Sequence, residues 1–208
     1  MLALAGCGGA QQEVTEEPVQ ETKQTTQEAP KLTGVAAELQ NLMATKSKME
    51  YQITYDVVAK AEGQEFKSTM IQYFDGVSRF RTDVTIKGMS EIRIYVIDGT
   101  GTSCAKANNK WVCSATQVQD DASKQAENSI AQGSARHAVT ADGTKQLLGK
   151  THNCYKAIDS AQEITMRYCF SADGVLVYNS AETSQVTTEM TALLYGKDVA
   201  ETVWVIPT

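Results

Sequence analysis

The chain has 208 residues, with 19 Lys and Arg against 25 Asp and Glu, and therefore a formal charge of −6 at pH 7. This mild acidity excludes the basic patch that a nucleic-acid-binding protein needs. No stretch of about 18 apolar residues could span a bilayer as a helix, and the 2 His are too few for a multi-histidine metal site. The length suits one domain, or one domain and a tail.

The first residues have the pattern of an export and lipidation signal. Residues 1–7 end in Leu4-Ala5-Gly6-Cys7, which resembles the lipobox at which prokaryotic lipoprotein precursors are acylated on Cys and cleaved before it. A complete signal peptide has a charged start and an apolar stretch of about 7–15 residues, so we interpret residues 1–7 as a truncated one. The alternative is a chance Leu-Ala-Gly-Cys in a cytoplasmic protein.

Residues 8–31 predict a disordered tether. Gln, Glu and Thr fill most of this segment, and it has no aromatic residue. Such a composition buries too little apolar surface to offset the ordering of the chain. A flexible segment directly after an acylated Cys7 would hold the following domain, residues 32–208, beside the cell membrane. We therefore expect a lipid-anchored, extracytoplasmic protein, on the cell surface or the periplasmic side.

The first part of this domain predicts one helix and a series of strands. Leu32–Thr45 has apolar residues at helical spacing, and Thr33 can cap its start. Met49–Val58 alternates apolar and polar residues, as a half-buried antiparallel strand does. Gly-containing turns then separate three further expected strands: Glu65–Phe74, Ser78–Ile86 and Met89–Asp98.

Four Cys remain after Cys7, and an even number in an exported chain predicts disulfides. Asn108-Asn109 suits a two-residue hairpin turn because Asn tolerates positive φ. This turn places Cys104 opposite Cys113 at a non-hydrogen-bonded pair. The Cα atoms approach there to about 4.5 Å, which a disulfide accepts.

A second hairpin, centred on Ala161-Gln162, places Cys154 opposite Cys169. In this register the apolar and polar residues separate onto two faces, which supports it, and the bridge is expected on the wetter face. One alternative is a four-cysteine zinc site, although such sites draw ligands from closer pairs. The other is a reactive thiol, for which the sequence offers neither a CxxC nor a recognisable Cys–His arrangement.

Thr116–Gly133 predicts a second helix with a thin, mostly Ala stripe, either a lid or a loosely held surface element. Val199–Thr208 is expected to pack as an irregular apolar plug. A single antiparallel sheet of about ten strands must curl, split or be covered on one face. The remaining expected strands are Ala135–Ala141, Lys145–Asp159, Glu163–Ser171, Val175–Ala181 and Val186–Tyr195.

The order of these elements resembles the lipoprotein-sorting and lipid-carrier superfamily, the LolA/LolB-like and LppX/LprG-like proteins. The resemblance implies a mainly β (α+β) fold: a single strongly curved antiparallel sheet, or half-open barrel, with about two helices on its concave side. It also implies binding of acyl chains in the hollow. The segments that carry it are the N-terminal helix, the Tyr51–Val57 strand, Gly143–Lys150 before Cys154, Cys169–Tyr178 and Val203–Pro207.

The sequence contains no constellation that indicates an enzyme. Asp98-Gly-Thr-Gly is an aspartic-protease-like string, but the chain offers no second copy of it. His137 and His152 are expected to be surface or hydrogen-bonded residues rather than ligands. We therefore expect no catalytic residue, metal site or cofactor.

The apolar strand faces suggest a function, although they suit an ordinary core as well. We expect a protein that binds a lipid or other amphiphile in an apolar cavity, as a carrier or in lipoprotein sorting. The alternative is a ligand-free envelope scaffold or sensor that acts through contacts with an unidentified protein partner. The candidate ligand-binding residues are Tyr51, Ile53, Tyr55, Phe66, Met70, Phe74, Ile92, Ile94, Met166 and Tyr168.

Overall fold

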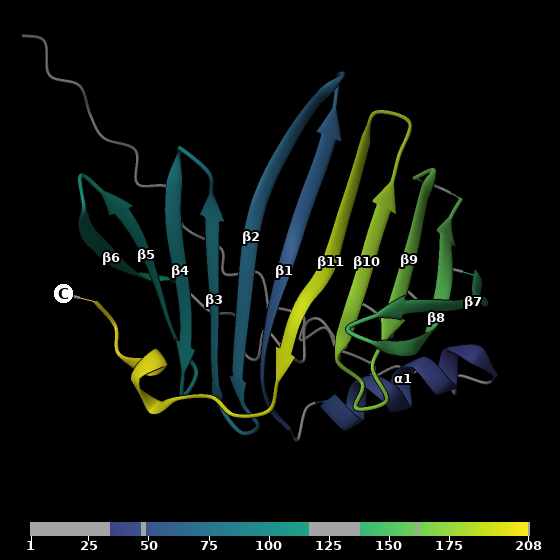
Figure 1. Cartoon of the computed structure of the whole chain (residues 1–208), viewed down its shortest axis with the longest axis horizontal. Helices are drawn as coiled ribbons and strands as arrows, with labels where there is room; N and C mark the ends of the chain where they lie inside the picture. The colour runs from purple at the N-terminus through teal and green to yellow at the C-terminus, as the bar shows by residue number, and fades with distance from the viewer. Residues whose placement is uncertain (1–33, 47–48, 117–137, 161, 208) are drawn as a thin grey trace, which may run out of the picture. The chain divides into compact units, whose positions relative to one another are not determined.

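The structure, a computed structural model, describes residues 34–46, 49–116, 138–160 and 162–207. They form one α-helix, α1 (Val35–Lys46), a short 3₁₀ helix, η1 (Glu201–Trp204), and a large set of strands (Figure 1). The strands are β1 (Glu50–Ala61), β2 (Gln64–Asp75), β3 (Arg79–Ile86), β4 (Ser90–Ile97), β5 (Thr100–Ala107), β6 (Lys110–Thr116), β7 (Ala138–Leu147), β8 (Lys150–Asp159), β9 (Ile164–Phe170), β10 (Leu176–Glu182) and β11 (Val186–Gly196).

All the strands belong to one 11-stranded antiparallel sheet in the order β6-β5-β4-β3-β2-β1-β11-β10-β9-β8-β7. From β1 the chain runs outward through successive neighbours to β6. It resumes at the other edge with β7 and returns inward to β11, which pairs with β1. The sheet is therefore not closed, since its two ends, β6 and β7, have no ladder between them. This confirms the predicted single open antiparallel sheet.

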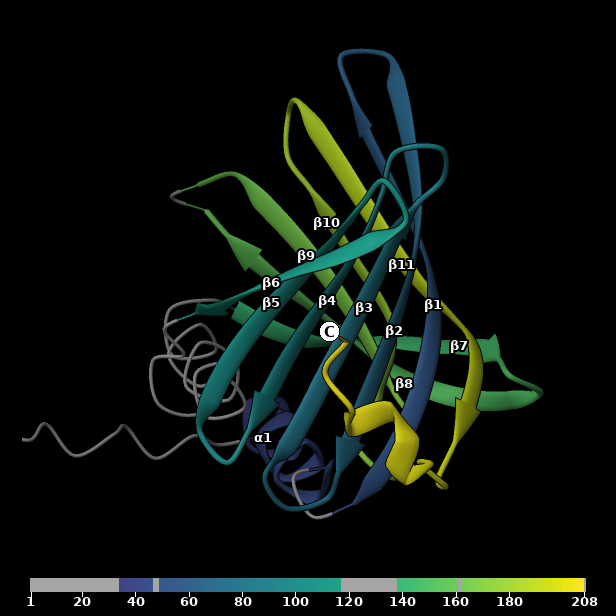
Figure 2. The ribbon, with the colours of Figure 1, turned by 90° about the vertical axis from the view of Figure 1, so that its left-hand side faces the viewer.

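The sheet is strongly curved, and its two faces carry different coverings (Figure 2). We call the concave face the one that carries Tyr51, Ile53 and Tyr55 of β1 and the residues in register with them on the other strands. The alternate residues form the convex face. Helix α1 lies on the concave side, whereas η1 and the C-terminal residues lie on the convex side.

Helix α1 is attached to the sheet by a small apolar cluster. Leu39, which is 2 % exposed, packs with Tyr155 and Phe170. The Tyr155 hydroxyl also donates a hydrogen bond of 2.8 Å to Oε1 of Glu38. The prediction of about two helices is wrong for the part of the chain that the structure describes, which has one α-helix. The second predicted helix, Thr116–Gly133, lies outside these residues except for Thr116, which ends β6.

The main core lies where the two halves of the sheet meet. Tyr51, Ile53 and Tyr55 are at most 1 % exposed, and they cluster with Val175 and Val177. The Tyr55 hydroxyl donates a hydrogen bond of 2.7 Å to the carbonyl of Leu176, so β1 is tied to β10 across β11. The buried residues of β1 are thus the alternate apolar ones that the sequence pattern assigned to one face of the strand.

The two predicted disulfides are present, each between directly opposed residues. Cys104 pairs with Cys113 at a Cα–Cα distance of 4.0 Å, and Cys154 pairs with Cys169 at 4.1 Å. The zinc and reactive-thiol alternatives are therefore excluded for these four Cys. Ala161, at the centre of the second predicted turn, lies outside the described residues.

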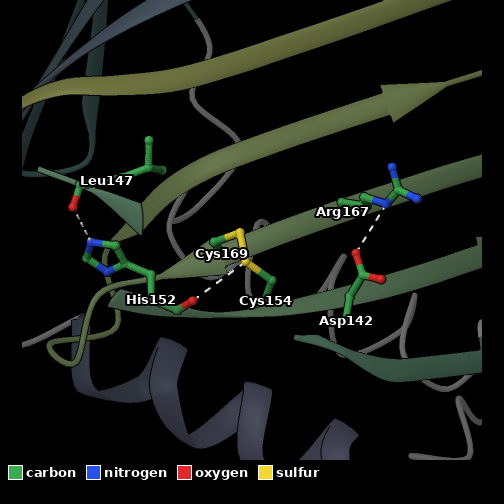
Figure 3. Close-up of a disulfide and its surroundings, with 6 residues drawn as sticks. All are labelled: Asp142, Leu147, His152, Cys154, Arg167 and Cys169. Carbon is green, nitrogen blue, oxygen red and sulfur yellow. Dashed lines mark hydrogen bonds and ion pairs between the residues drawn. A yellow bond between two sulfur atoms is a disulfide. The ribbon is translucent and has the colours of Figure 1, made fainter. Parts of the chain in front are cut away.

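The expectation that the second bridge lies on the wetter face is wrong. Cys154 and Cys169 are 6 % and 1 % exposed and belong to the main core cluster. Leu147 and Leu148, at the tip of the β7–β8 hairpin, pack against the same cluster. Figure 3 shows the bridge beside His152, whose carbonyl lies 3.7 Å from Sγ of Cys154.

The β7–β8 hairpin divides the chain differently from the prediction. The sequence predicts two strands, Ala135–Ala141 and Lys145–Asp159, but β7 continues without a break from Ala138 to Leu147, with an irregularity in register between Ala141 and Thr144. Gly143 has a φ of +75°, so it serves a bulge rather than a turn. The turn comes instead at Leu148-Gly149, where both residues have positive φ.

The C-terminal segment, predicted to pack as an irregular apolar plug, makes polar and cation–π contacts as well as apolar ones. Trp204 is buried, but its ring lies under the Arg79 guanidinium, 4.9 Å from the ring centroid. Arg79 also pairs with Glu201, and Arg81 donates a hydrogen bond to the carbonyl of Val203. The C-terminal residues are therefore fixed to the convex face of β3 largely by two arginines.

Candidate functional site

The concave face holds every residue that the sequence predicted to contact a ligand. Opposed pairs such as Tyr51 and Phe74, or Tyr55 and Met70, share this face, and the same register extends to the outer strands. The ten residues are Tyr51, Ile53 and Tyr55 on β1, Phe66, Met70 and Phe74 on β2, Ile92 and Ile94 on β4, and Met166 and Tyr168 on β9.

Burial divides these ten residues into two groups. Tyr51, Ile53, Tyr55 and Phe74 are at most 9 % exposed and form part of the core. The other six keep accessible surface: Phe66 and Ile94 are 47 % and 39 % exposed, and Met70, Ile92, Met166 and Tyr168 are half-buried. The second group is the one whose side chains can meet a ligand.

Sequence reasoning missed other apolar residues of the same surface. Phe80, Val84 and Ile86 of β3 are half-buried on the concave face, and Val112 of β6 is 65 % exposed there. The alternation along β3 was visible in the sequence, but only the register shows that it lies between the apolar residues of β2 and β4. We call the accessible apolar residues of this part of the face the β2–β6 strip: Phe66, Met70, Phe80, Val84, Ile86, Ile92, Ile94 and Val112. Gln72, Thr82 and Ser103 lie in register among them. Accessible apolar patches can mark interaction sites.

The two faces of the sheet also differ in charge. On β1–β5 and β9–β11, every Asp, Glu, Lys and Arg is in register with the convex face. Arg81, Asp83 and Arg93 illustrate the pattern, since each alternates with an apolar or neutral residue that faces the concave side. Along these strands, within the described residues, the concave face is therefore free of ionisable acids and bases other than tyrosines.

The tyrosines of the concave face stay protonated at neutral pH. Burial raises the pKa of Tyr51 and Tyr55 well above the usual value of 10, and it also raises the pKa of Tyr168. A buried tyrosinate would lack water to solvate its charge. These hydroxyls therefore act as neutral hydrogen-bond donors, as Tyr168 does toward Sδ of Met166 at 2.9 Å.

The residues considered for catalysis or metal binding have ordinary structural contacts. Asp98 lies in an exposed turn, where it accepts a hydrogen bond of 2.8 Å from the Ser78 hydroxyl. His152 is buried, with Nε2 2.9 Å from the carbonyl oxygen of Leu147; His137 lies outside the described residues. In the described ranges no group of His, Cys, Asp and Glu is arranged to hold a metal ion. No helix there has the length and apolarity needed to cross a bilayer.

Neither the models of known protein families nor the curated proteins yield a match to this sequence. Solved structures do match. The complex of MucA and MucB from Pseudomonas aeruginosa matches with a TM-score of 0.57 and 13 % identity, over 83 % of this chain and 61 % of that one. This chain has the fold of the part of MucB that it matches, and it spans about three fifths of the MucB chain.

Two further solved structures match this chain. An uncharacterised conserved protein from Thermus thermophilus matches with a TM-score of 0.54 and 11 % identity, over 82 % of this chain and 93 % of that one. A LolA superfamily protein from Nitrosomonas europaea matches with a TM-score of 0.41 and 7 % identity, over 81 % and 97 %. At these identities the likeness to the solved structures concerns the fold alone.

Proposed function

We propose that this protein binds the acyl chain of a lipid, or a similar apolar part of an amphiphile, against its concave face. The observation that carries the proposal is the β2–β6 strip, an accessible apolar surface on a sheet whose charges lie on the opposite face. Binding would involve no covalent chemistry. The chain would act as a carrier or in the handling of lipoproteins, without a cofactor.

Hydrophobic transfer supplies a free energy of the same size as the cost of such binding. Each buried methylene contributes about 0.8 kcal/mol, so a chain of about twelve carbons gains roughly 10 kcal/mol before the costs of association. Those costs are estimated at about 4–15 kcal/mol. The expected affinity is therefore modest, which suits a carrier that must also release its ligand.

An uncharged fluorescent probe, N-phenyl-1-naphthylamine, tests this proposal on the purified full chain. We expect saturable binding, and mass spectrometry of an organic extract should find co-purifying lipid. Ile94→Asp places a charge in the strip and should weaken probe binding at least about tenfold, because the carboxylate must be desolvated by the probe. Thr85→Asp, on the convex face of β3, is the matched control and should bind the probe normally. A clean extract together with no probe uptake would contradict the proposal.

We further propose that Cys7 is acylated and holds the domain at the extracytoplasmic side of a membrane. The lipobox-like Leu4-Ala5-Gly6-Cys7 supports this, and two disulfides are typical of an oxidising compartment. When the chain is expressed behind a complete lipoprotein signal peptide, metabolically supplied palmitate should label it. Cys7→Ala should abolish the label and release the protein from membranes. Equal labelling of both proteins would rule out Cys7 as the site.

A second candidate function is a scaffold or sensor that binds another envelope protein. The match to MucB, solved in complex with MucA, favours this possibility. A photo-crosslinking amino acid at position 94 distinguishes the two functions. Crosslinks to lipid support the carrier function, whereas crosslinks to a single protein, with no probe uptake by the purified chain, support the scaffold.

A further inference from the structure

We infer that the ligand carries an anionic head group, a carboxylate or a phosphate, which lies at the cleft between the β3–β4 and β5–β6 hairpins while the acyl chain lies on the β2–β6 strip. The inference rests on the proposed function and specifies its ligand class, an anionic amphiphile. Three observations carry it: a cleft that adjoins the strip, unpaired lysines beside that cleft, and turns of the opposite charge at the other end of the same strands.

The cleft forms because strands β4 and β5 separate near one end. Their ladder stops at Ile92 and Ala105. Strand β4 nevertheless begins at Ser90, and β5 continues to Ala107. The space between the two hairpins is a cleft of about 360 Å³. Its lining residue Ile86 also belongs to the strip, so the apolar surface runs directly into the cleft. Figure 1 shows both hairpins turning at the upper end of the sheet.

Two exposed lysines beside this cleft have no ion pair within the described residues. Lys87 directly precedes Gly88, which lines the cleft. Lys110 directly follows Asn109, which also lines it. Along the described strands β1–β6, Lys110 is the charged residue in register with the concave face, and no Asp or Glu of these strands shares that face. An anion at the edge of the strip therefore meets a cation and no acid there.

The cleft itself supplies hydrogen-bond donors and one acid. The side-chain amides of Asn108 and Asn109 line it, and each can donate a hydrogen bond to an anion. The acid, Glu91, is held at 2.9 Å by Lys106 and at 2.9 Å by Arg93. Its charge is therefore already compensated, and the two unpaired lysines set the sign of the local charge.

The turns at the opposite end of the same strands have the other sign. Asp75 ends β2, and Asp98 lies in the turn between β4 and β5, where it accepts a hydrogen bond from the Ser78 hydroxyl. Arg79 is paired with Asp75, but Glu201 adds a second carboxylate to the same guanidinium. This difference between the two ends orients an anionic amphiphile with its head group at the cleft.

Displacement of N-phenyl-1-naphthylamine from the full chain by dodecanoate or by dodecyltrimethylammonium, at about pH 8, tests the charge of the ligand. The two competitors have the same chain length and opposite charges. The chain carries a net charge of −6, which favours the cation by non-specific attraction. We expect dodecanoate to bind at least about fivefold more tightly, because the lysines beside the cleft act locally. Equal affinities, or tighter binding of the cation, would overturn the inference and leave the proposed function in place. If neither competitor nor the probe binds, the proposed function fails, and the inference fails with it.

Two pairs of exposed lysines give a matched comparison. Lys87→Glu with Lys110→Glu reverses the charge beside the cleft. Lys60→Glu with Lys67→Glu makes the same change of net charge on the neighbouring β1–β2 hairpin. We expect the first double variant to bind dodecanoate about tenfold more weakly, and the second to bind it within about twofold of wild type. All four side chains are exposed, so both variants should fold. An equal loss in both, or no loss in the first, would overturn the inference.

Competition distinguishes a lipid head group from a free anion as the source of the charge. Inorganic phosphate at millimolar concentration and constant ionic strength should change the affinity for dodecanoate by less than about twofold, since exposed lysines alone bind an anion weakly. Strong competition by phosphate in the wild-type chain, lost in Lys87→Glu with Lys110→Glu, would indicate a site for small anions and overturn the assignment to an amphiphile.

Discussion

Removal of the two disulfides should cost this protein a large share of its stability. The loop closed by Cys104 and Cys113 has a sequence separation of 9, and the loop closed by Cys154 and Cys169 has one of 15. In the chain-entropy description, loops of this size restrict the unfolded state by about 2.5–3 kcal/mol each. Replacing a pair of Cys by Ala also removes buried sulfur atoms, since Cys104, Cys154 and Cys169 are at most 6 % exposed.

We therefore expect each double substitution, Cys104→Ala with Cys113→Ala or Cys154→Ala with Cys169→Ala, to lower the free energy of unfolding by about 3–5 kcal/mol. Both together should remove about 6–10 kcal/mol. This is comparable with the total stability of a typical domain, about 5–15 kcal/mol. The quadruple variant, and the wild-type chain made in a reducing cytosol, should then be largely unfolded.

Urea denaturation followed by circular dichroism measures these losses. Cys7→Ala is the control, since Cys7 precedes the sheet and takes no part in either bridge; it should leave the unfolding midpoint unchanged. A loss below about 1 kcal/mol for either double variant would refute the reasoning, as would a fully folded quadruple variant.

Two further predictions concern the convex arginines and the tyrosines. Arg81→Met should lower the free energy of unfolding by about 3–5 kcal/mol, because it leaves the half-buried Asp83 without its main partner. Arg167→Met, whose side chain and partner Asp142 are 48 % and 32 % exposed, should cost about 1 kcal/mol or less. Equal losses in urea denaturation would contradict this difference. The pKa values of Tyr155 and Tyr195 are raised to about 12, mainly by burial. Their contribution to stability is therefore complete below about pH 10, the unfolded value, and is lost as the pH rises from about 10 to about 12. Urea midpoints that stay constant across this range would argue against it, and Tyr155→Phe should make the decline shallower.

The hairpins were the part of the fold most accessible from the sequence. Asn108-Asn109 fixes the register of Cys104 and Cys113, since a two-residue turn leaves one way to pair the flanking strands. Centring the second hairpin on Ala161-Gln162, so that apolar and polar residues separate onto two faces, placed Cys154 opposite Cys169. The faces of each strand followed from alternation alone, so the ten candidate ligand residues could be assigned to one surface before the order of the strands was known.

The wrong predictions concern places where contacts between residues distant in sequence override the pattern of the neighbouring residues. Asp142-Gly143 has the composition of a turn, but pairing with β8 continues past it and converts the glycine into a bulge. The second disulfide shares its strand faces with polar residues such as Lys156 and Arg167, but it is buried in the main core cluster, against which Leu147 and Leu148 pack. Pairing of the first strand with the last could not be read from either sequence segment, and it is this pairing that forms the main core.

The β1–β11 ladder joins the two halves of the sheet, which we call wings: β1–β6 and β7–β11. This ladder, the seam, differs from the rest of the sheet in the distance along the chain between the residues that it pairs. Within each wing every strand pairs with its immediate successor, so the contacts are local and can form early. The seam joins residues as distant as Tyr55 and Ala192, and it must wait for nearly the whole chain. A chain that is made from its N-terminus can therefore pair β1 to β6 early, but the core tyrosines of β1 stay uncovered on the β11 side until the last strand is added.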